Sequence, residues 1–228
     1  MAERTKLWYL ENFNIFKDLP ESSIMKLNEI TTMQDIPRNQ PIYFAKEPSN
    51  SIFFLKKGRV KLTRTDNEGK EMIIGLVNRG EVFGEMSILD ESARTDYAIA
   101  LDDCLVCAIN KDEFRKFVDS NPELNLRLTK LMGLKVKRYS ERIEDLVFKD
   151  ATQRIISFLI KLADENGKQL GDQIFVKPFL KHQDIAELTA CSRQTVNTVL
   201  TDLREKGIIN FDRKKLVISK KDELQKMI

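Results

Sequence analysis

The chain has 228 residues, of which 42% are hydrophobic and 32% charged, and its formal net charge at pH 7 is only +3. This length allows two medium-sized domains with cores of their own, and the composition excludes a disordered or fibrous protein. No apolar run approaches the roughly 18 residues of a membrane span, and the N-terminal segment has no signal-peptide pattern. The sequence therefore predicts a cytoplasmic protein without a membrane partner, and its three cysteines fit a reducing compartment.

In the first hundred or so residues, the spacing of apolar residues changes from a helical to a strand-like pattern. Apolar residues recur at helical intervals over residues 5–16 and again from Ile24 to Ile30. From Thr31 onward, short apolar runs alternate with turn residues, and Asp66–Gly69 has the composition of a hairpin turn. Recurring short strands at this spacing predict a β-sandwich or barrel. Asn110 and Glu113 then form a plausible capping pair for a helix.

The segment GEVFGEMSIL, which ends at Leu89, is followed by an Arg-Thr pair. Gly84 lets backbone N–H groups approach a phosphate, and the stretch that begins at Met86 can present a helix N-terminus to an anion. Arg94 and Thr95 can bind a phosphate, and Glu85 can accept a hydrogen bond from a ribose hydroxyl. The alternative is a simple turn held by an ion pair between Arg94 and Glu85.

One long helix is predicted over residues 120–148. Pro122 suits the first helical position, behind the possible N-caps Ser120 and Asn121. Farther along, apolar residues alternate at spacings of four and three, which is the narrow seam of a two-stranded coiled coil. We interpret this seam as a dimer interface, the alternative being a helix packed on its own domain. The seam consists of Met132, Val136, Tyr139, Ile143 and Leu146.

The sequence of the C-terminal part predicts a nucleic-acid-binding domain. A helix is expected from Asp150 to about Gly167, a strand at Ile174–Val176, and two short helices between Lys181 and Gly207. Ser192 is a good N-cap for the second short helix, whose outer face is polar and has few acids. A recognition helix needs this arrangement because its first turn reaches base edges in the major groove. The outward residues are Arg193, Gln194, Asn197, Thr198 and Thr201.

The chemistry of these side chains suits DNA. Arg193 can bind guanine O6 and N7 bidentately, and Gln194 can pair with adenine N6 and N7. A hairpin with a basic tip follows at residues 208–218, where Arg213 and Lys214, together with Lys206, are expected to hold phosphates. The alternative is a helical hairpin with a solvated polar face.

The sequence gives little support for a metal or redox site. Cys104 and Cys107 have the C-x-x-C spacing of zinc and redox sites, but residues three apart in a strand point to opposite faces. We therefore expect buried structural cysteines, and expect Cys191 to pack in the turn between the short helices. His182 is the one histidine in the chain, so no metal site and no catalytic group is predicted.

In order along the chain, SIFFLKKGRVKL, EGKE, GEVFGEMSIL with RT, NPEL, DATQRI and CSRQTV resemble the cyclic-AMP receptor protein and fumarate–nitrate regulator (Crp/Fnr) family of bacterial transcription factors. The resemblance implies an α+β fold. A cyclic-nucleotide-binding-type β-roll, which is a double-stranded β-helix, would occupy residues 1–119 with the N-terminal helices. A long dimerisation helix would occupy residues 120–148, and a winged helix-turn-helix residues 149–228.

The resemblance also implies a homodimer on a two-fold-symmetric operator in double-stranded DNA, with RNA polymerase as a candidate partner. Site residues carry over by motif to cyclic-nucleotide contacts, base-facing positions of the long helix, and DNA contacts. The cyclic-nucleotide contacts are Gly84, Glu85, Arg94 and Thr95, and the base-facing positions are Tyr139 and Ser140. The DNA contacts are Arg193, Gln194 and Thr198.

This chain departs from the family pattern at several positions. Asp96 replaces a small residue beside the phosphate-binding pair; in an extended strand it would share a face with Arg94 and neutralise it. Tyr139 adds bulk where a base would lie, and Gln194 replaces an acid of many recognition helices. The N-terminus lacks the cysteine cluster of the iron–sulfur branch, and the β-roll lacks histidine, which disfavours heme.

These departures leave the effector open between cyclic AMP or another cyclic nucleotide, a different small molecule, and none. Two further hypotheses are a metal-dependent cupin enzyme and a cyclic-nucleotide regulatory subunit that acts through a protein partner. The first requires histidines in the strands, and none precedes His182. The second leaves the polar recognition face and the basic hairpin unexplained.

Overall fold

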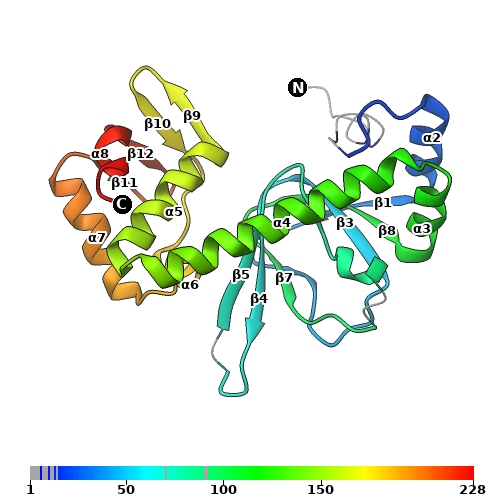
Figure 1. Cartoon of the computed structure of the whole chain (residues 1–228), viewed down its shortest axis with the longest axis horizontal. Helices are drawn as coiled ribbons and strands as arrows, with labels where there is room; N and C mark the ends of the chain where they lie inside the picture. The colour runs from blue at the N-terminus through cyan, green and yellow to red at the C-terminus, as the bar shows by residue number, and fades with distance from the viewer. Residues whose placement is uncertain (1–5, 7–9, 11–12, 14, 70, 90–91) are drawn as a thin grey trace. The chain divides into compact units, whose positions relative to one another are not determined.

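The computed structural model describes residues 6, 10, 13, 15–69, 71–89 and 92–228. The chain divides into two compact units, Met1–Lys135 and Val136–Ile228 (Figure 1). The helix expected over residues 5–16 lies largely outside the described residues. In the part of the chain that is described, no helix is both long and apolar enough to cross a membrane.

Two four-stranded antiparallel sheets form the body of the first unit. One has the strand order β1 (Thr31–Ile36), β8 (Cys104–Asn110), β3 (Ser51–Lys57), β6 (Val82–Phe83). The other has the order β2 (Pro41–Tyr43), β7 (Tyr97–Ala100), β4 (Val60–Thr65), β5 (Glu71–Val77). The turn predicted at Asp66–Gly69 joins β4 to β5, and the α+β fold class with its N-terminal β-roll is confirmed.

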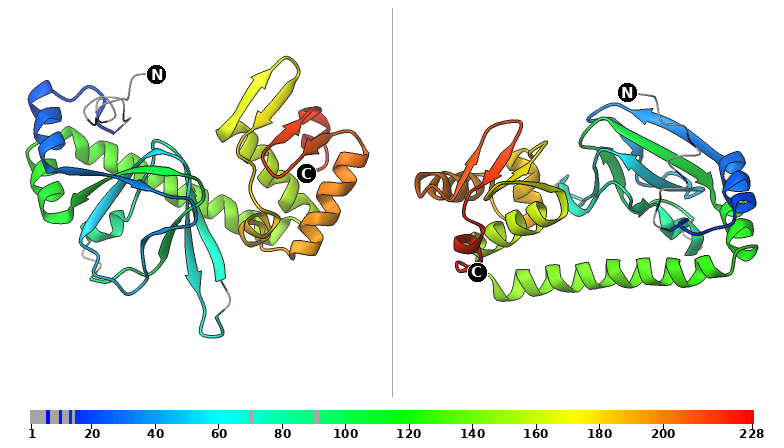
Figure 2. Two further views of the ribbon diagram at one scale, coloured as in Figure 1. Left: turned by 180° about the vertical axis from the view of Figure 1, so that it is seen from behind. Right: turned by 90° about the horizontal axis from the view of Figure 1, so that it is seen from above.

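Side chains alternate between the two faces of a strand, so one strand contributes residues to two separate cores. In β8, Cys104 belongs to the core between the sheets, whereas Cys107 belongs to the core beneath the helices. The two thiols therefore point to opposite faces, as the spacing predicted, and both are buried and free. Helices α2 (Glu21–Ile30) and α3 (Lys111–Asp119) cover the second core and lie together at one end of the sheets (Figure 2).

Helix α4 (Glu123–Phe148) has 26 residues and begins one residue after Pro122. In its first half, Leu124, Leu128 and Leu131 pack against the core beneath the helices, which fixes this half on the β-roll. The seam residues lie on a neighbouring stripe, because at about 100° per residue they fall within an arc of about 80° beside these leucines. The helix thus carries a packed face and a second apolar stripe.

The second unit is a helical core with a small sheet. Helix α5 (Ala151–Asn166) begins with a capping box in which Asp150 and Gln153 bond each other's backbone N–H groups. Helices α6 (His182–Thr189) and α7 (Arg193–Glu205) follow, and α8 (Lys221–Gln225) lies near the end of the chain. The sheet has the order β11 (Ile209–Phe211), β12 (Leu216–Ile218), β10 (Gln173–Val176), β9 (Gly167–Leu170).

Strand β9 was not predicted. It starts directly at Gly167, where α5 was expected to end, and its residues are mostly exposed. A Cβ at Gly167 would lie 2.3 Å from the Ala163 carbonyl oxygen and 2.4 Å from Ile174 Cγ2. Glycine therefore permits the abrupt passage from helix to strand, and the predicted strand at Ile174–Val176 receives β9 as its hairpin partner.

Candidate effector and nucleic-acid sites

In the first unit, Gly84 and Arg94 form one structural element. Gly84 has a φ of +70° and leads from β6 into a short 3-10 helix, η1 (Glu85–Leu89). Arg94 is only 4% exposed; its Nη1 donates to the Gly84 carbonyl at 3.0 Å, and its Nη2 donates to the Ser51 carbonyl. A Cβ on residue 84 would lie 2.8 Å from Arg94 Nη1, so glycine is required for this approach.

Tyr43 lies beneath the same guanidinium. The Arg94 Cζ atom is 4.4 Å from the centre of the Tyr43 ring, and the ring also stacks on Phe53. The Tyr43 hydroxyl donates to Asp96 Oδ1 at 3.2 Å. Burial, and then the negative charge of Asp96, raise the pKa of Tyr43 far above its usual value, while Arg94 opposes them. The phenol therefore remains a hydrogen-bond donor at neutral pH.

Glu85 and Thr95, the other predicted effector contacts in this part of the chain, have partners elsewhere. Glu85 forms an ion pair with Lys135 of α4 at 2.7 Å, and Lys135 Nζ also donates to the Val82 carbonyl at 2.9 Å. The sequence offered an ion pair between Glu85 and Arg94 as an alternative. In the structure Glu85 pairs with Lys135. Thr95 is exposed, and its hydroxyl accepts from Arg64 Nη2 at 3.1 Å. Met86 is 47% exposed on η1.

One premise about Asp96 was wrong. The extended strand that was expected to carry Arg94 and Asp96 begins only at Tyr97, and residues 95–96 form a bend. The Asp96 carboxylate accepts a hydrogen bond from the Tyr43 hydroxyl. Tyr43, Lys135 and Arg64 were missed as site residues. Only Lys135 had a signal, since it precedes Tyr139 by four residues on the same helix.

The seam of α4 is exposed to solvent in the single chain. Val136 is 63% exposed, Ile143 61%, Tyr139 47% and Leu146 44%, whereas Met132 is partly buried. Exposed apolar residues in register on one helix are unusual unless a partner covers them. Tyr139 and Ser140 belong to the second unit, so their part in an effector site stays a prediction.

Helix α7 presents its polar face as the sequence predicted. The Ser192 hydroxyl accepts the Thr195 backbone N–H at 3.0 Å, which caps the helix. The inward stripe is fully apolar and consists of Val196, Val199, Leu200 and Leu203. Opposite this stripe, four candidate DNA-contacting side chains are exposed, namely Arg193, Gln194, Asn197 and Thr198. The Thr198 hydroxyl donates to the Gln194 carbonyl at 3.1 Å.

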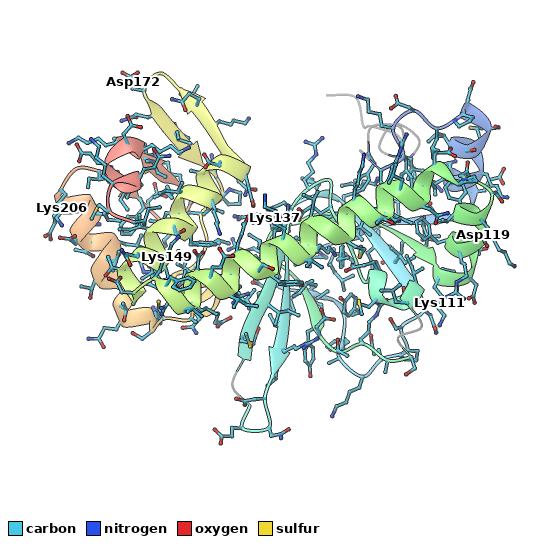
Figure 3. All side chains as sticks on the ribbon, viewed as in Figure 1. Lys111, Asp119, Lys137, Lys149, Asp172 and Lys206 are labelled. Carbon is cyan, nitrogen blue, oxygen red and sulfur yellow. The ribbon has the colours of Figure 1, made fainter. Side chains whose placement is uncertain are left out.

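Strands β11 and β12 pair as the predicted hairpin, with Arg213 and Lys214 exposed at its tip. Asp212 accepts the backbone N–H groups of Lys214 and Lys215, and the first of these bonds is the main reason that its pKa falls below the usual range. Lys206, labelled at the end of α7 in Figure 3, pairs with Asp202 at 2.7 Å. The hairpin tip is thereby shaped by a carboxylate while its basic side chains remain outside.

Phe211 connects this hairpin to both short helices and was missed by sequence reasoning. Its ring centre lies 5.6 Å from that of His182 at the start of α6 and 6.2 Å from that of Phe179. The Arg204 Cζ atom, near the end of α7, lies 5.1 Å from the Phe211 ring centre. Burial and then the charge of Arg193 lower the pKa of His182, which favours the neutral imidazole.

Metal ligation receives no geometric support among the described residues. No group of three or more His, Cys, Asp or Glu side chains in that part of the chain is arranged to hold a metal ion. Burial raises the pKa of the Cys104 thiol to about 11 and also raises that of Cys107. Such thiols are poor nucleophiles and poor ligands at neutral pH.

Comparison with known proteins matches both halves of the chain. Residues 33–121 match the family model of the cyclic nucleotide-binding domain, and residues 153–227 match the Crp-like helix-turn-helix domain. A "CRP-like cAMP-activated global transcriptional regulator" of Mycobacterium tuberculosis is 28% identical over 94% of this chain and 96% of its own length. The "Global nitrogen regulator" of a Nostoc species is 32% identical over 82% of this chain and 85% of its own length.

Solved structures agree on the fold. FixK2 from Bradyrhizobium japonicum gives a TM-score of 0.77 at 19% identity, and covers 86% of this chain and 96% of its own. A variant of CooA from Carboxydothermus hydrogenoformans gives 0.75 at 23% identity, covering 96% of this chain and 94% of its own.

Proposed function

This chain belongs to the Crp family of DNA-binding transcription regulators rather than to an enzyme family, and we propose that it acts as a homodimer on a two-fold-symmetric operator. The observation that carries the proposal is the exposed polar face of α7 on a fully apolar inner stripe. Such a helix is held rigidly from behind while its first turn offers Arg193 and Gln194 to base edges.

The proposed DNA contacts divide by chemistry. Arg193, Gln194 and Asn197 read base edges, and the exposed Thr198 contacts a thymine methyl. Ser192, Lys206, Arg213 and Lys214 hold phosphates or orient the groups that do. Because the protein works on the chromosome, we place it in the cytoplasm, with RNA polymerase as the further partner to test.

The dimer would form along α4. Val136, Tyr139 and Ile143 are each about half exposed or more in the single chain, and they recur at the coiled-coil spacing. With Met132 and Leu146 they would bury a continuous seam against the same residues of a second copy. This isologous contact is what a two-fold-symmetric operator requires of its reader.

The β-roll would supply control through a small effector. Several relatives are named as cAMP-activated, and residues 33–121, which include Gly84, Glu85, Arg94 and Thr95, match the cyclic nucleotide-binding domain, which supports a cyclic nucleotide. Arg94 is already engaged with two carbonyl groups, and Asp96 adds a negative charge near it, which supports a different effector or none. Calorimetric titration with cyclic AMP and with cyclic GMP separates the two candidates, because heat in either titration favours the first and silence in both favours the second.

Selection from a random duplex library tests DNA reading itself. The proposal expects enrichment of an inverted repeat and a binding constant that falls steeply with salt, by a log–log slope of about −0.9 per phosphate contact. A library that shows no enrichment, together with weak and salt-insensitive retention, would contradict DNA reading and favour action through a protein partner.

A further inference from the structure

A single side chain of α5 bonds the ends of two other helices. Arg154 Nε donates to the Thr189 carbonyl at 2.9 Å, and its Nη1 donates to the Lys149 carbonyl at 2.9 Å. Thr189 is the last residue of α6, and Lys149 directly follows the last residue of α4. The last carbonyl groups of a helix have no intrahelical partner, so one guanidinium satisfies such groups at both helix ends.

The same guanidinium also contacts the turn that precedes the reader helix. Nη2 donates to the Ala190 carbonyl at 3.2 Å and lies 3.6 Å from Cys191 Sγ. Ala190 has a left-handed conformation, with φ +51° and ψ +46°, which an L-residue adopts only when its surroundings hold it there. Only Cys191 and Ser192 separate this residue from α7, so the direction in which α7 leaves the turn depends on how the turn is held.

Arginine suits this position because of its shape. Its planar guanidinium has five N–H donors in a fixed fork, whereas lysine offers one ammonium on a flexible chain and methionine offers no donor. We propose that Arg154 is a positioning residue for DNA readout, which holds the α6–α7 turn against the end of α4 so that the first turn of α7 meets base edges. This inference rests on the proposed function, since it concerns how the same reader recognises sequence.

The prediction separates positioning from two simpler roles. If Arg154 held a phosphate, its loss would weaken binding to every duplex and reduce the salt slope by about 1. If it only stabilised the fold, its loss would lower the affinities for all duplexes by one common factor. Mispositioning of α7 instead lowers the affinity for the selected sequence alone, because phosphate contacts tolerate a small rotation better than bidentate base contacts do.

The experiment uses the full chain and two duplexes of equal length, one selected by the wild-type protein from a random library and one with that sequence scrambled. Dissociation constants are measured by fluorescence anisotropy over a range of salt concentrations for the wild type, Arg154→Met and Arg154→Lys. We expect the ratio of scrambled to selected dissociation constants to fall about tenfold or more in both variants. The affinity for the scrambled duplex and the salt slope should stay within error.

Lys161→Gln provides the matched control. Lys161 lies on the same helix and pairs with Asp145 at 3.3 Å and Glu141 at 3.6 Å on α4, but it does not reach the turn in the described contacts. Its substitution should leave the ratio unchanged. If Arg154→Met fails to fold, as judged by circular dichroism, Arg154→Lys decides the matter because it keeps the charge and the aliphatic stem.

The outcomes distinguish this inference from the proposed function. An unchanged ratio in a folded Arg154 variant, or an equal loss of affinity for both duplexes, overturns the inference while the proposed function stands. A wild-type chain that selects no sequence overturns both.

Discussion

The guanidinium carbon of Arg94 lies 4.4 Å from the centre of the Tyr43 ring, and the hydroxyl of that ring donates to Asp96. The cation that the family would offer to a phosphate thus shares its surroundings with a carboxylate held in place by a buried phenol. Arg94 is also satisfied by two backbone carbonyl groups. An anionic ligand entering here would meet a guanidinium that already donates to two carbonyl groups, with a carboxylate on the same tyrosine.

Asp96→Ala should therefore strengthen cyclic-nucleotide binding. A carboxylate about 5 Å from a phosphate costs about 3 kcal/mol at an effective dielectric constant of 20, so the dissociation constant for cyclic AMP should fall by about a hundredfold. Calorimetric titration of both proteins measures this directly. Asp35→Ala, which removes an exposed carboxylate from β1 of the same unit, is the control and should change nothing. Equal affinities in the wild type and Asp96→Ala would show that Asp96 does not govern the site.

Val136→Lys should break the proposed dimer. Burial of one such side chain is worth about 1.5–3 kcal/mol, and an isologous seam contains it twice, so the dimer dissociation constant should rise by at least about a hundredfold. Sedimentation velocity over a concentration series measures the change. Leu134→Lys is the matched control, because Leu134 is 60% exposed compared with 63% for Val136, yet lies about 200° around the helix from it. Equal effects of the two substitutions would rule out the seam as the interface.

Ala190→Gly should stabilise the second unit. The left-handed conformation of Ala190 costs an L-residue about 1–2 kcal/mol, and glycine avoids this cost but loses part of the gain to its greater unfolded-state entropy. The free energy of unfolding should rise by about 0.5–1 kcal/mol in urea titrations. Ala186→Gly, in the middle of α6, should instead lower it by about 1 kcal/mol or more. A destabilised Ala190→Gly protein would contradict the account of the turn.

Lys56 should make the stability of the first unit depend on pH above neutrality. Its Nζ lies 3.9 Å from the centre of the Phe13 ring, and burial lowers the pKa of Lys56 to about 8 from 10.5, partly opposed by Cys107. Below pH 8 the amine is charged in both the folded and the unfolded state. Between pH 8 and 10.5 only the unfolded state retains the proton, so raising the pH favours the folded state.

Comparison of the wild type with Lys56→Met isolates this effect. From pH 7 to pH 9.5 the free energy of unfolding of the wild type should rise by about 2 kcal/mol relative to that of the variant. Urea titrations under reducing conditions measure the difference. A difference that stays constant over this range would mean that Lys56 keeps an ordinary pKa.

Sequence patterns predicted the elements whose signal is local. The stripe of Val196, Leu200 and Leu203 with the Ser192 cap located α7, and the opposite faces of Cys104 and Cys107 followed from strand alternation alone. These features depend on spacing within one element, which the sequence displays directly.

Contacts between distant segments were not predictable in this way. Tyr43 and Asp96 are 53 residues apart, and Arg154 bonds carbonyl groups 35 and 36 residues away, which no periodicity reveals. Strand β9 was missed because its exposed, weakly apolar residues gain their structure from pairing with β10. Every residue has a backbone carbonyl, so an acceptor such as that of Gly84 cannot be recognised from the residue type.

The central claim is that two copies pair along α4 and present two α7 helices to successive major grooves. Its most direct test is selection of duplexes by the full chain, followed by sedimentation equilibrium of the complex with the selected duplex. We predict an inverted repeat whose half-sites are centred about 10–10.5 base pairs apart, or a multiple of this, and two chains bound per duplex. One chain bound to a site without inverted symmetry would contradict the claim.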